Sequence, residues 1–224
     1  MASMAKPFEQ YCPVAHALGL VGDRWSLLIV RDLLHGARRY SDLLAGLPGI
    51  GTNILAARLR ALEEAGIVTK RRLPPPAAST VYELTGYGAE LREVFFALAR
   101  WGARSLGPPG PGDELYPEWG LNAAAALFSP EAARGLTETY VLRIEGDAFT
   151  VRVDDGRMHA ELGAAEDAEV VVETDMNSFF ALASGEVTPR MALKGGLVKI
   201  EGDPAALERC FQVLTLVPRT PAAA

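Results

Sequence analysis

Apolar residues recur at helical spacing in the segment GIGTNILAARLRALEEAG (49–66). Three leucines stand four and three positions apart in it, which predicts one apolar stripe along a helix of about 14 residues. Thr52 lies where an N-cap residue is expected, and Gly66 follows the last periodic residue, where a left-handed conformation favours glycine. The face opposite the leucines begins with small and polar residues and carries Arg60, so one side of this helix suits a core and the other suits solvent or a partner.

Helical and strand-like patterns flank this helix through the first half of the chain. Residues 67–73 and 79–85 carry β-branched residues and are separated by prolines, so they predict a β-hairpin. Asp23 is a candidate N-cap for the second helix, and Ser41 stands near the start of the third. The other segments with helical patterns are 13–20, 25–34, 40–44 and 88–105.

The second half combines short strand patterns with helices, which predicts a compact α+β unit. Alternating apolar residues, ended by glycine or acidic residues, predict strands at 139–146, 148–156, 158–164, 169–175 and 198–203. Helices are predicted at 119–128, at 176–185 and from Pro204 onward, where Asp203 is the expected cap.

Size and composition place the chain among globular proteins. It has 224 residues, of which 49% are hydrophobic, and this suits one large domain or two small ones. The apolar runs are far shorter than the roughly 18 residues of a membrane helix, and no signal-peptide pattern opens the sequence. Cys12 and Cys210 match no zinc or redox-pair spacing. We therefore expect a cytoplasmic protein with reduced cysteines and no membrane partner.

The net charge of −6 hides a strong separation of charge along the chain. Residues 1–106 contain 13 Lys and Arg against 9 Asp and Glu, whereas the remaining residues contain 9 against 19. The change coincides with the segment GPPGPGDELYP, which cannot continue a helix. The sequence thus predicts a first domain at 1–106, a linker at 107–118, a second domain at 119–217 and a flexible tail at 218–224.

Cations of the first half gather in three clusters around the capped helix. They are Arg38 and Arg39, then Arg58 and Arg60, then Lys70, Arg71 and Arg72. The order helix, helix, short helix, capped helix, hairpin is the layout of a winged helix-turn-helix, in which the capped helix enters the major groove. A solvated helix face is the alternative for any single cluster, but three clusters in this layout favour DNA binding.

The residues from 11 to 105 resemble the HxlR-type, MarR-like winged-helix transcriptional regulators. The resemblance rests on the motifs CPV, GDRW (usually a GGKW-like sequence), RRY, PGI, RLRALEEAG and VYELTGYGAEL and on the pair Trp101–Gly102. It implies a homodimer that binds double-stranded operator DNA of pseudo-palindromic sequence. It also implies that the first and last helices of this domain supply most of the dimer contacts.

By this resemblance, Thr52, Asn53 and Ala56 form the base-reading face, and the cations contact phosphates or base edges. The wing tip at 74–79 lacks cations, which departs from the family pattern and leaves the strand residues as the wing contacts. The full set of expected DNA-binding residues is Arg24, Arg38, Arg39, Ser41, Thr52, Asn53, Ala56, Arg58, Arg60, Lys70, Arg71 and Arg72.

Two members of this set have an alternative role. The helical angle of Arg58 turns it toward the leucine side, so it could equally brace the domain by pairing with Asp42 or Glu63. Arg24 could be a simple surface charge.

The same resemblance implies a candidate redox site at Cys12. In some relatives of the family, the cysteine at this place senses thiol-reactive compounds near the dimer interface. The alternative is a small buried hydrophobic residue, which is the usual state of a free cysteine. No Lys or Arg is adjacent in the sequence to favour the thiolate, although Lys6 is a candidate neighbour in space.

The segment from 167 to 211 resembles the sterol-carrier-protein fold, a small α/β domain with an apolar tunnel. The resemblance rests on an acidic residue before an aromatic helix, a Gly-centred turn and the sequence GLVKIEGD. It implies a fold that can hold a hydrophobic small molecule, and plain core packing is the alternative for the same side chains. The candidate lining residues are Met176, Phe179, Phe180, Met191, Leu193, Leu197 and Phe211.

The sequence contains no recognisable catalytic motif. The sequence has no G-x-S-x-G elbow and no Walker loop, and its three histidines share no metal-ligand spacing, so we expect no catalytic residues, metal or cofactor. The sequence favours an α+β regulator: a homodimeric DNA-binding repressor that responds to a small hydrophobic effector. The alternative is a lipid or metabolite carrier that uses its winged helix only for dimerisation.

Overall fold

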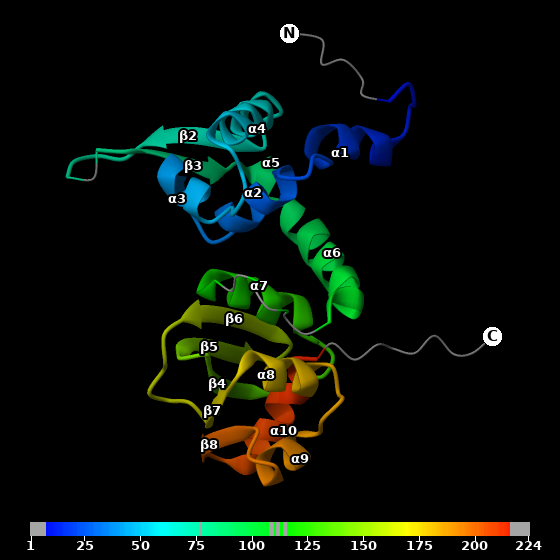
Figure 1. The fold of residues 1–224 in the computed structure, drawn as a ribbon, viewed down its shortest axis with the longest axis vertical. Helices are drawn as coiled ribbons and strands as arrows, with labels where there is room; N and C mark the ends of the chain where they lie inside the picture. The colour runs from blue at the N-terminus through cyan, green and yellow to red at the C-terminus, as the bar shows by residue number, and fades with distance from the viewer. Residues whose placement is uncertain (1–7, 77, 108–109, 111–112, 114–115, 216–224) are drawn as a thin grey trace. The chain divides into compact units, whose positions relative to one another are not determined.

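The computed structural model describes residues 8–76, 78–107, 110, 113 and 116–215 (Figure 1). The chain divides between Phe95 and Phe96 into two compact units, and a separate hydrophobic core lies on each side. The predicted tail at 218–224 lies outside the described residues, as does part of the predicted linker at 107–118. The predicted domain boundaries therefore stay predictions.

The first unit has the element order of a winged helix-turn-helix. Its elements are α1 (Pro13–Val21), α2 (Ser26–Leu33), β1 (Arg38–Arg39), α3 (Tyr40–Ala45), α4 (Thr52–Glu64), β2 (Val68–Arg72), β3 (Thr80–Leu84), α5 (Gly86–Ala89) and the start of α6 (Leu91–Leu106). The strands form an antiparallel sheet in the order β1-β3-β2, so the predicted hairpin is confirmed. Strand β1 and the separate short helix α5 were not predicted from the sequence.

A shared core fixes the orientation of α4. Leu55, Leu59 and Leu62 are buried, as their spacing predicted, and they belong to one cluster with Ile29 and Val30 of α2. Each fully buried aliphatic side chain contributes about 1.5–3 kcal/mol. This packing decides which face of α4 turns outward.

The predicted helix caps are correct at one end of α4 and wrong at the other. Gly66 follows the helix with φ of +70°, the left-handed conformation that glycine adopts without strain. Thr52, however, is the first helical residue, and Gly51 holds the N-cap position without a side-chain hydrogen bond. Asp23 is likewise not the N-cap of α2, because Trp25 holds that position; the Asp23 carboxylate accepts the Trp25 N–H at 3.0 Å instead.

A close contact at Gly88 joins α5 to the start of the wing. A Cβ atom on Gly88 would lie 2.0 Å from the carbonyl oxygen of Ile67, so only glycine fits without a backbone shift. Thr85 supports the junction, because its hydroxyl accepts the Gly88 N–H at 3.0 Å and donates to the carbonyl oxygen of Gly66 at 2.6 Å. The hairpin therefore starts from a fixed point beside the end of α4.

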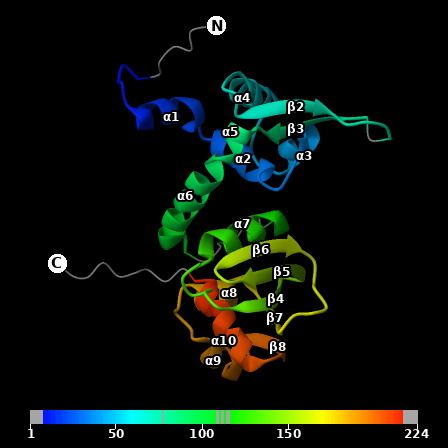
Figure 2. The same ribbon diagram turned by 180° about the vertical axis from the view of Figure 1, so that it is seen from behind.

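The second unit is a five-stranded sheet with helices packed on it (Figures 1 and 2). Strand order is β6-β5-β4-β7-β8, and every pair is antiparallel except β4 with β7. Helix α7 packs against β5 and β6, and α10 packs against β7. The elements are α7 (Pro117–Leu127), β4 (Thr137–Ile144), β5 (Asp147–Asp154), β6 (Arg157–Leu162), β7 (Val170–Thr174), α8 (Met176–Ala183), α9 (Pro189–Lys194), β8 (Val198–Gly202) and α10 (Pro204–Val213).

Most of these elements match the sequence prediction to within two residues at each end. Asp203 caps α10, as predicted, because its carboxylate accepts the Ala205 N–H at 2.8 Å, and Pro204 is the first helical residue. Helix α9 is the exception, since no helix was predicted there. Its N-cap is Thr188, whose hydroxyl accepts the Met191 N–H at 3.3 Å.

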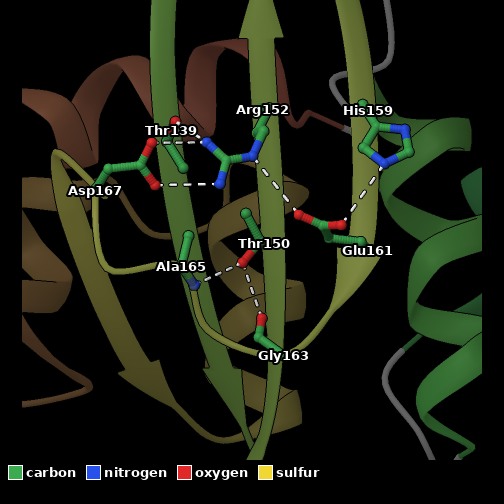
Figure 3. A network of polar contacts seen from close by, with 8 residues as sticks. All are labelled: Thr139, Thr150, Arg152, His159, Glu161, Gly163, Ala165 and Asp167. Atoms are coloured by element: carbon green, nitrogen blue, oxygen red, sulfur yellow. Dashed lines mark hydrogen bonds and ion pairs between the residues drawn. The ribbon is translucent and has the colours of Figure 1, made fainter.

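The connection from β6 to β7 is held against the sheet by side chains of β5 (Figure 3). Because β6 is an edge strand and β7 lies beyond β4, this connection has to pass β5 and β4. The hydroxyl of Thr150, which is 1% exposed, donates to the carbonyl oxygen of Gly163 at 2.9 Å and accepts the Ala165 N–H at 3.0 Å. Arg152 makes a forked pair with Asp167 at 2.9 and 3.1 Å. These bonds fix the crossover on the face of the sheet opposite the one that carries the core.

Candidate nucleic-acid interface

The outward face of α4 carries the residues expected to read bases. Thr52, Asn53, Ala56 and Arg60 are all exposed, because the leucine stripe takes the opposite side. Ile54 is also exposed, by 47%, and sequence reasoning did not single it out. Its position outside the leucine stripe is the signal that could have identified it, since an apolar side chain can contact the methyl group of thymine.

The first turn of α4 is anchored to α3 by Tyr40. The Tyr40 hydroxyl donates to the carbonyl oxygen of Thr52 at 2.6 Å. Ser41, another expected DNA-binding residue, is exposed in the first turn of α3, and its hydroxyl donates to Asp42 at 3.2 Å. The hydrogen bond from Tyr40 therefore sets the spacing between the two helices at the end where the expected base contacts lie.

Arg58 faces the body of the unit rather than the outward face of α4. Its Nη1 atom lies 3.5 Å from the carboxylate of Asp23, so it joins α4 to the turn before α2. The two partners proposed from the sequence are wrong. Asp42 accepts the backbone N–H of Arg39, and Glu63 pairs with Lys70.

The sheet places two cation clusters side by side. Strands β1 and β2 flank β3, so Arg38 and Lys70 are both opposite Tyr82, while Arg39 and Arg71 are both opposite Val81. Neighbouring strands are about 4.8 Å apart, so these cations, distant in the sequence, stand about 10 Å apart at the backbone. This arrangement follows from the strand order, which the sequence did not give.

Besides Arg58, three cations among the expected DNA-binding residues make contacts that limit their freedom. Lys70 lies 2.8 Å from Glu63 and 5.5 Å from the centre of the Tyr82 ring, and Arg71 makes a forked pair with Glu83. Arg24 lies 5.0 Å from the centre of the Trp25 ring. Within the described part of the chain, Arg38, Arg39, Arg60 and Arg72 form no ion pair with a carboxylate.

The charges of this surface act on one another. The hydrogen bond to Glu63 raises the pKa of Lys70, while the positive charge of Arg60 opposes that rise. The hydrogen bond from Arg71 lowers the pKa of Glu83. The charge of Arg60 on the recognition helix is therefore close enough to act on Lys70 of β2.

The expected ligand-lining residues of the second unit divide into a buried group and an exposed group. Phe179 and Phe211 are buried in the core, with ring centres 5.8 Å apart, and Met176 packs at its margin. Phe180 is half-buried. In contrast, Met191, Leu193 and Leu197 are exposed by 61%, 38% and 41% on α9 and the turn after it. Helical spacing alone could not separate these two groups.

A hollow of about 420 Å³ lies at one end of the strands of the second unit. Its lining is mostly charged or polar, and of the expected residues it includes Leu197. The lining residues are Arg143, Glu145, Gly146, Glu173, Thr174, Asp175, Gly196, Leu197 and Lys199. Two of its carboxylates are already engaged, because Glu145 accepts the Met176 N–H at 3.0 Å and Asp175 accepts the Ser178 N–H at 2.8 Å.

The two cysteines have different environments. Cys12 is partly exposed at the N-cap position of α1, so it is not the fully buried residue of the alternative interpretation. Lys6 lies outside the described residues, and redox sensing at Cys12 stays a prediction. Cys210 is fully buried in the core of the second unit, and burial strongly raises the pKa of its thiol.

In the ranges that the structure covers, no three His, Cys, Asp or Glu side chains are grouped so that they could hold a metal ion. Nor does any helix within those ranges have the length and apolar character to cross a membrane.

Comparisons with known proteins match each half of the chain separately. Residues 20–109 match the family described as HxlR-like helix-turn-helix, and residues 121–215 match the SCP-2 sterol transfer family. Three relatives are named HTH-type transcriptional regulators. The protein sll1512 of Synechocystis is 38% identical over 41% of this chain and 68% of its own length. YodB of Bacillus subtilis is 34% identical over 48% of this chain and 94% of its own length. Rv3095 of Mycobacterium tuberculosis is 32% identical over 62% of this chain and 89% of its own length.

Proposed function

The chain belongs to the HxlR-like helix-turn-helix family, and from this premise we propose that it is a sequence-specific, DNA-binding transcriptional regulator that acts as a homodimeric repressor. One observation carries the proposal. Arg38, Arg39 and Arg72 of the sheet and Arg60 of α4 form no ion pair among the described residues, while α4 exposes small and polar residues beside them. A basic sheet next to a helix with a small outward face suits a major groove and its phosphates.

In the proposed complex, α4 lies in the major groove. Asn53 can form paired hydrogen bonds with the edge of adenine, and Arg60 can reach guanine or a phosphate. Ile54 and Ala56 offer apolar contacts to thymine methyl groups. The cations of β1 and β2 would bind the flanking backbone and fix the register of α4 in the groove.

Exposed apolar side chains on two helices support a dimer. Helix α1 exposes Val14 and Leu18, four residues apart, and α6 exposes Val94, Leu98 and Trp101 at helical spacing. Helix α6 has no buried residue, although apolar side chains recur along it. Such stripes in a single chain are typical of an interface between subunits. The mass in solution is the test, and a particle of 24.0 kDa, the mass of one chain, would exclude the dimer.

The second unit is proposed to sense an effector, a hydrophobic small molecule. The match to the SCP-2 sterol transfer family supports this class of ligand. If ligand binding changes the separation of two recognition helices that must read half-sites about 34–36 Å apart, DNA affinity changes with it. Coupling of this kind is typically about 5–150-fold, so a sterol or fatty acid that binds without shifting DNA affinity would exclude the mechanism.

A salt titration tests DNA binding itself. The slope of log affinity against log salt is about −0.9 per phosphate neutralised. The four cations that form no ion pair with a described residue, present on each of two subunits, therefore predict a slope near −7. Fluorescence anisotropy with the duplex upstream of its own gene, against a shuffled duplex, measures both the slope and the selectivity. A carrier that uses its winged helix only for dimerisation predicts no steep slope and no preference between the duplexes.

A further inference from the structure

Two cations of the wing form ion pairs with carboxylates of the same chain. The ammonium group of Lys70 lies 2.8 Å from Glu63 at the end of α4. The guanidinium of Arg71 pairs with Glu83 of the neighbouring strand through Nε at 3.0 and 3.1 Å and through Nη2 at 2.9 Å. Both pairs are open to solvent, with side chains that are between 28% and 50% exposed. Each carboxylate therefore stands where a phosphate could otherwise approach the same cation.

The two arginines opposite Val81 differ in their ion pairs. Arg39 and Arg71 stand on either side of Val81, one on β1 and one on β2. Arg71 is held by Glu83, whereas Arg39 forms no ion pair in the described part of the chain. Two arginines in equivalent places thus differ in whether they already hold an anion.

A carboxylate and a phosphate compete for the same guanidinium, because both bind it in the same forked geometry. A guanidinium binds either anion through two parallel N–H bonds. An exposed ion pair is worth little in water, so a phosphate can displace it, but the displaced carboxylate then remains close to the DNA backbone and repels it. The net gain from bringing Arg71 to DNA is therefore smaller than the gain from bringing Arg39.

We infer that Glu63 and Glu83 act as built-in competitors of DNA phosphate and limit the affinity that Lys70 and Arg71 give to the wing. The inference rests on the proposed function and names two carboxylates that set the strength of DNA binding. Because phosphate contacts carry no sequence information, these carboxylates weaken binding to any duplex and leave base reading to α4.

The opposite role is also physically reasonable and makes the inference testable. A carboxylate can hold an arginine in the orientation that a phosphate needs, and its removal then weakens binding. The two roles predict changes of opposite sign in the same variant, so a single measurement separates them.

The test uses the full chain and a shuffled-sequence duplex. Glu83→Gln and, independently, Glu63→Gln are each expected to tighten binding by roughly three- to tenfold and to steepen the salt slope by about 0.9 per subunit. Glu90→Gln is the matched control: it removes the same charge from an exposed residue between α5 and α6 that lies outside the three cation clusters. It should bind as the unsubstituted protein does.

A double-variant cycle shows whether the effect passes through the paired cation. In an Arg71→Gln background, Glu83→Gln should no longer steepen the slope, because the cation it would release is gone. Binding that is unchanged or weaker in both glutamine variants overturns the inference while the proposed function stands. Absence of salt-dependent binding by the unsubstituted protein overturns both. Unfolding midpoints of all variants confirm that each is folded.

Discussion

The double variant Arg39→Ala/Arg60→Ala is expected to lose about a hundredfold or more in DNA affinity at 0.1 M salt. Both side chains are exposed, and neither forms an ion pair within the described residues. One comes from β1 and the other from α4, so the variant weakens the backbone contact and the helix contact together. In a dimer it removes four cations, and the salt slope should fall from about −7 to about −3.5.

The measurement is the same anisotropy titration, and its control removes equal charge elsewhere. Arg157→Ala/Lys194→Ala takes two exposed cations from the second unit and should change neither affinity nor slope beyond a small effect of net charge. The fold should survive in the first variant, because the Arg39 contact with Asp42 is made by its backbone N–H. Unchanged DNA binding in Arg39→Ala/Arg60→Ala would remove our assignment of the recognition surface.

Gly88→Ala is expected to lower the free energy of unfolding of the first unit by about 1–3 kcal/mol, the usual cost of forcing an extra methyl group into a packed site. The added Cβ would lie 2.0 Å from the backbone carbonyl oxygen of Ile67, and a backbone atom cannot move aside as a side chain can. Relief requires α5 to move away from the first residues of the wing. DNA affinity should therefore fall as well, because the hairpin loses its fixed position beside α4.

Gly86→Ala provides the control, since it lies in the same short helix and a Cβ there meets nothing within 4 Å. Alanine favours a helix over glycine by about 0.8–1 kcal/mol, so this variant should be as stable as the unsubstituted protein or slightly more stable. Urea unfolding of the two variants measures the difference. Equal stabilities would show that the contact between Gly88 and Ile67 relaxes without cost.

Much of the fold could be predicted because it is encoded locally. The spacing of Leu55, Leu59 and Leu62 fixed the buried face of α4, and the left-handed Gly66 marked its end. Alternating residues likewise indicated the strands of both units. The family motifs in the first half and the sterol-carrier-like segment in the second were both confirmed by the family matches.

The rest of the candidate site depends on contacts between distant segments. The pairing of Arg71 with Glu83 requires the register of β2 on β3, and the pairing of Arg58 with Asp23 requires the packing of α4 against the start of α2. Neither is visible in local spacing. The expected ligand residues divide into buried and exposed side chains for another reason: apolar periodicity is the same for a core residue such as Phe179 as for an exposed one such as Met191.

The edges of the sheet in the second unit bear on how we expect the protein to behave at high concentration. Its edge strands are β6 and β8, and an uncovered edge can pair with a strand of another molecule. Here Arg157, His159 and Glu161 alternate along β6, and Lys199 and Glu201 along β8, all exposed. Edge-to-edge joining would crowd and desolvate these charged groups, so we expect the sheet to resist aggregation through its edges. We therefore expect pairing through these edges to contribute little to any association of subunits.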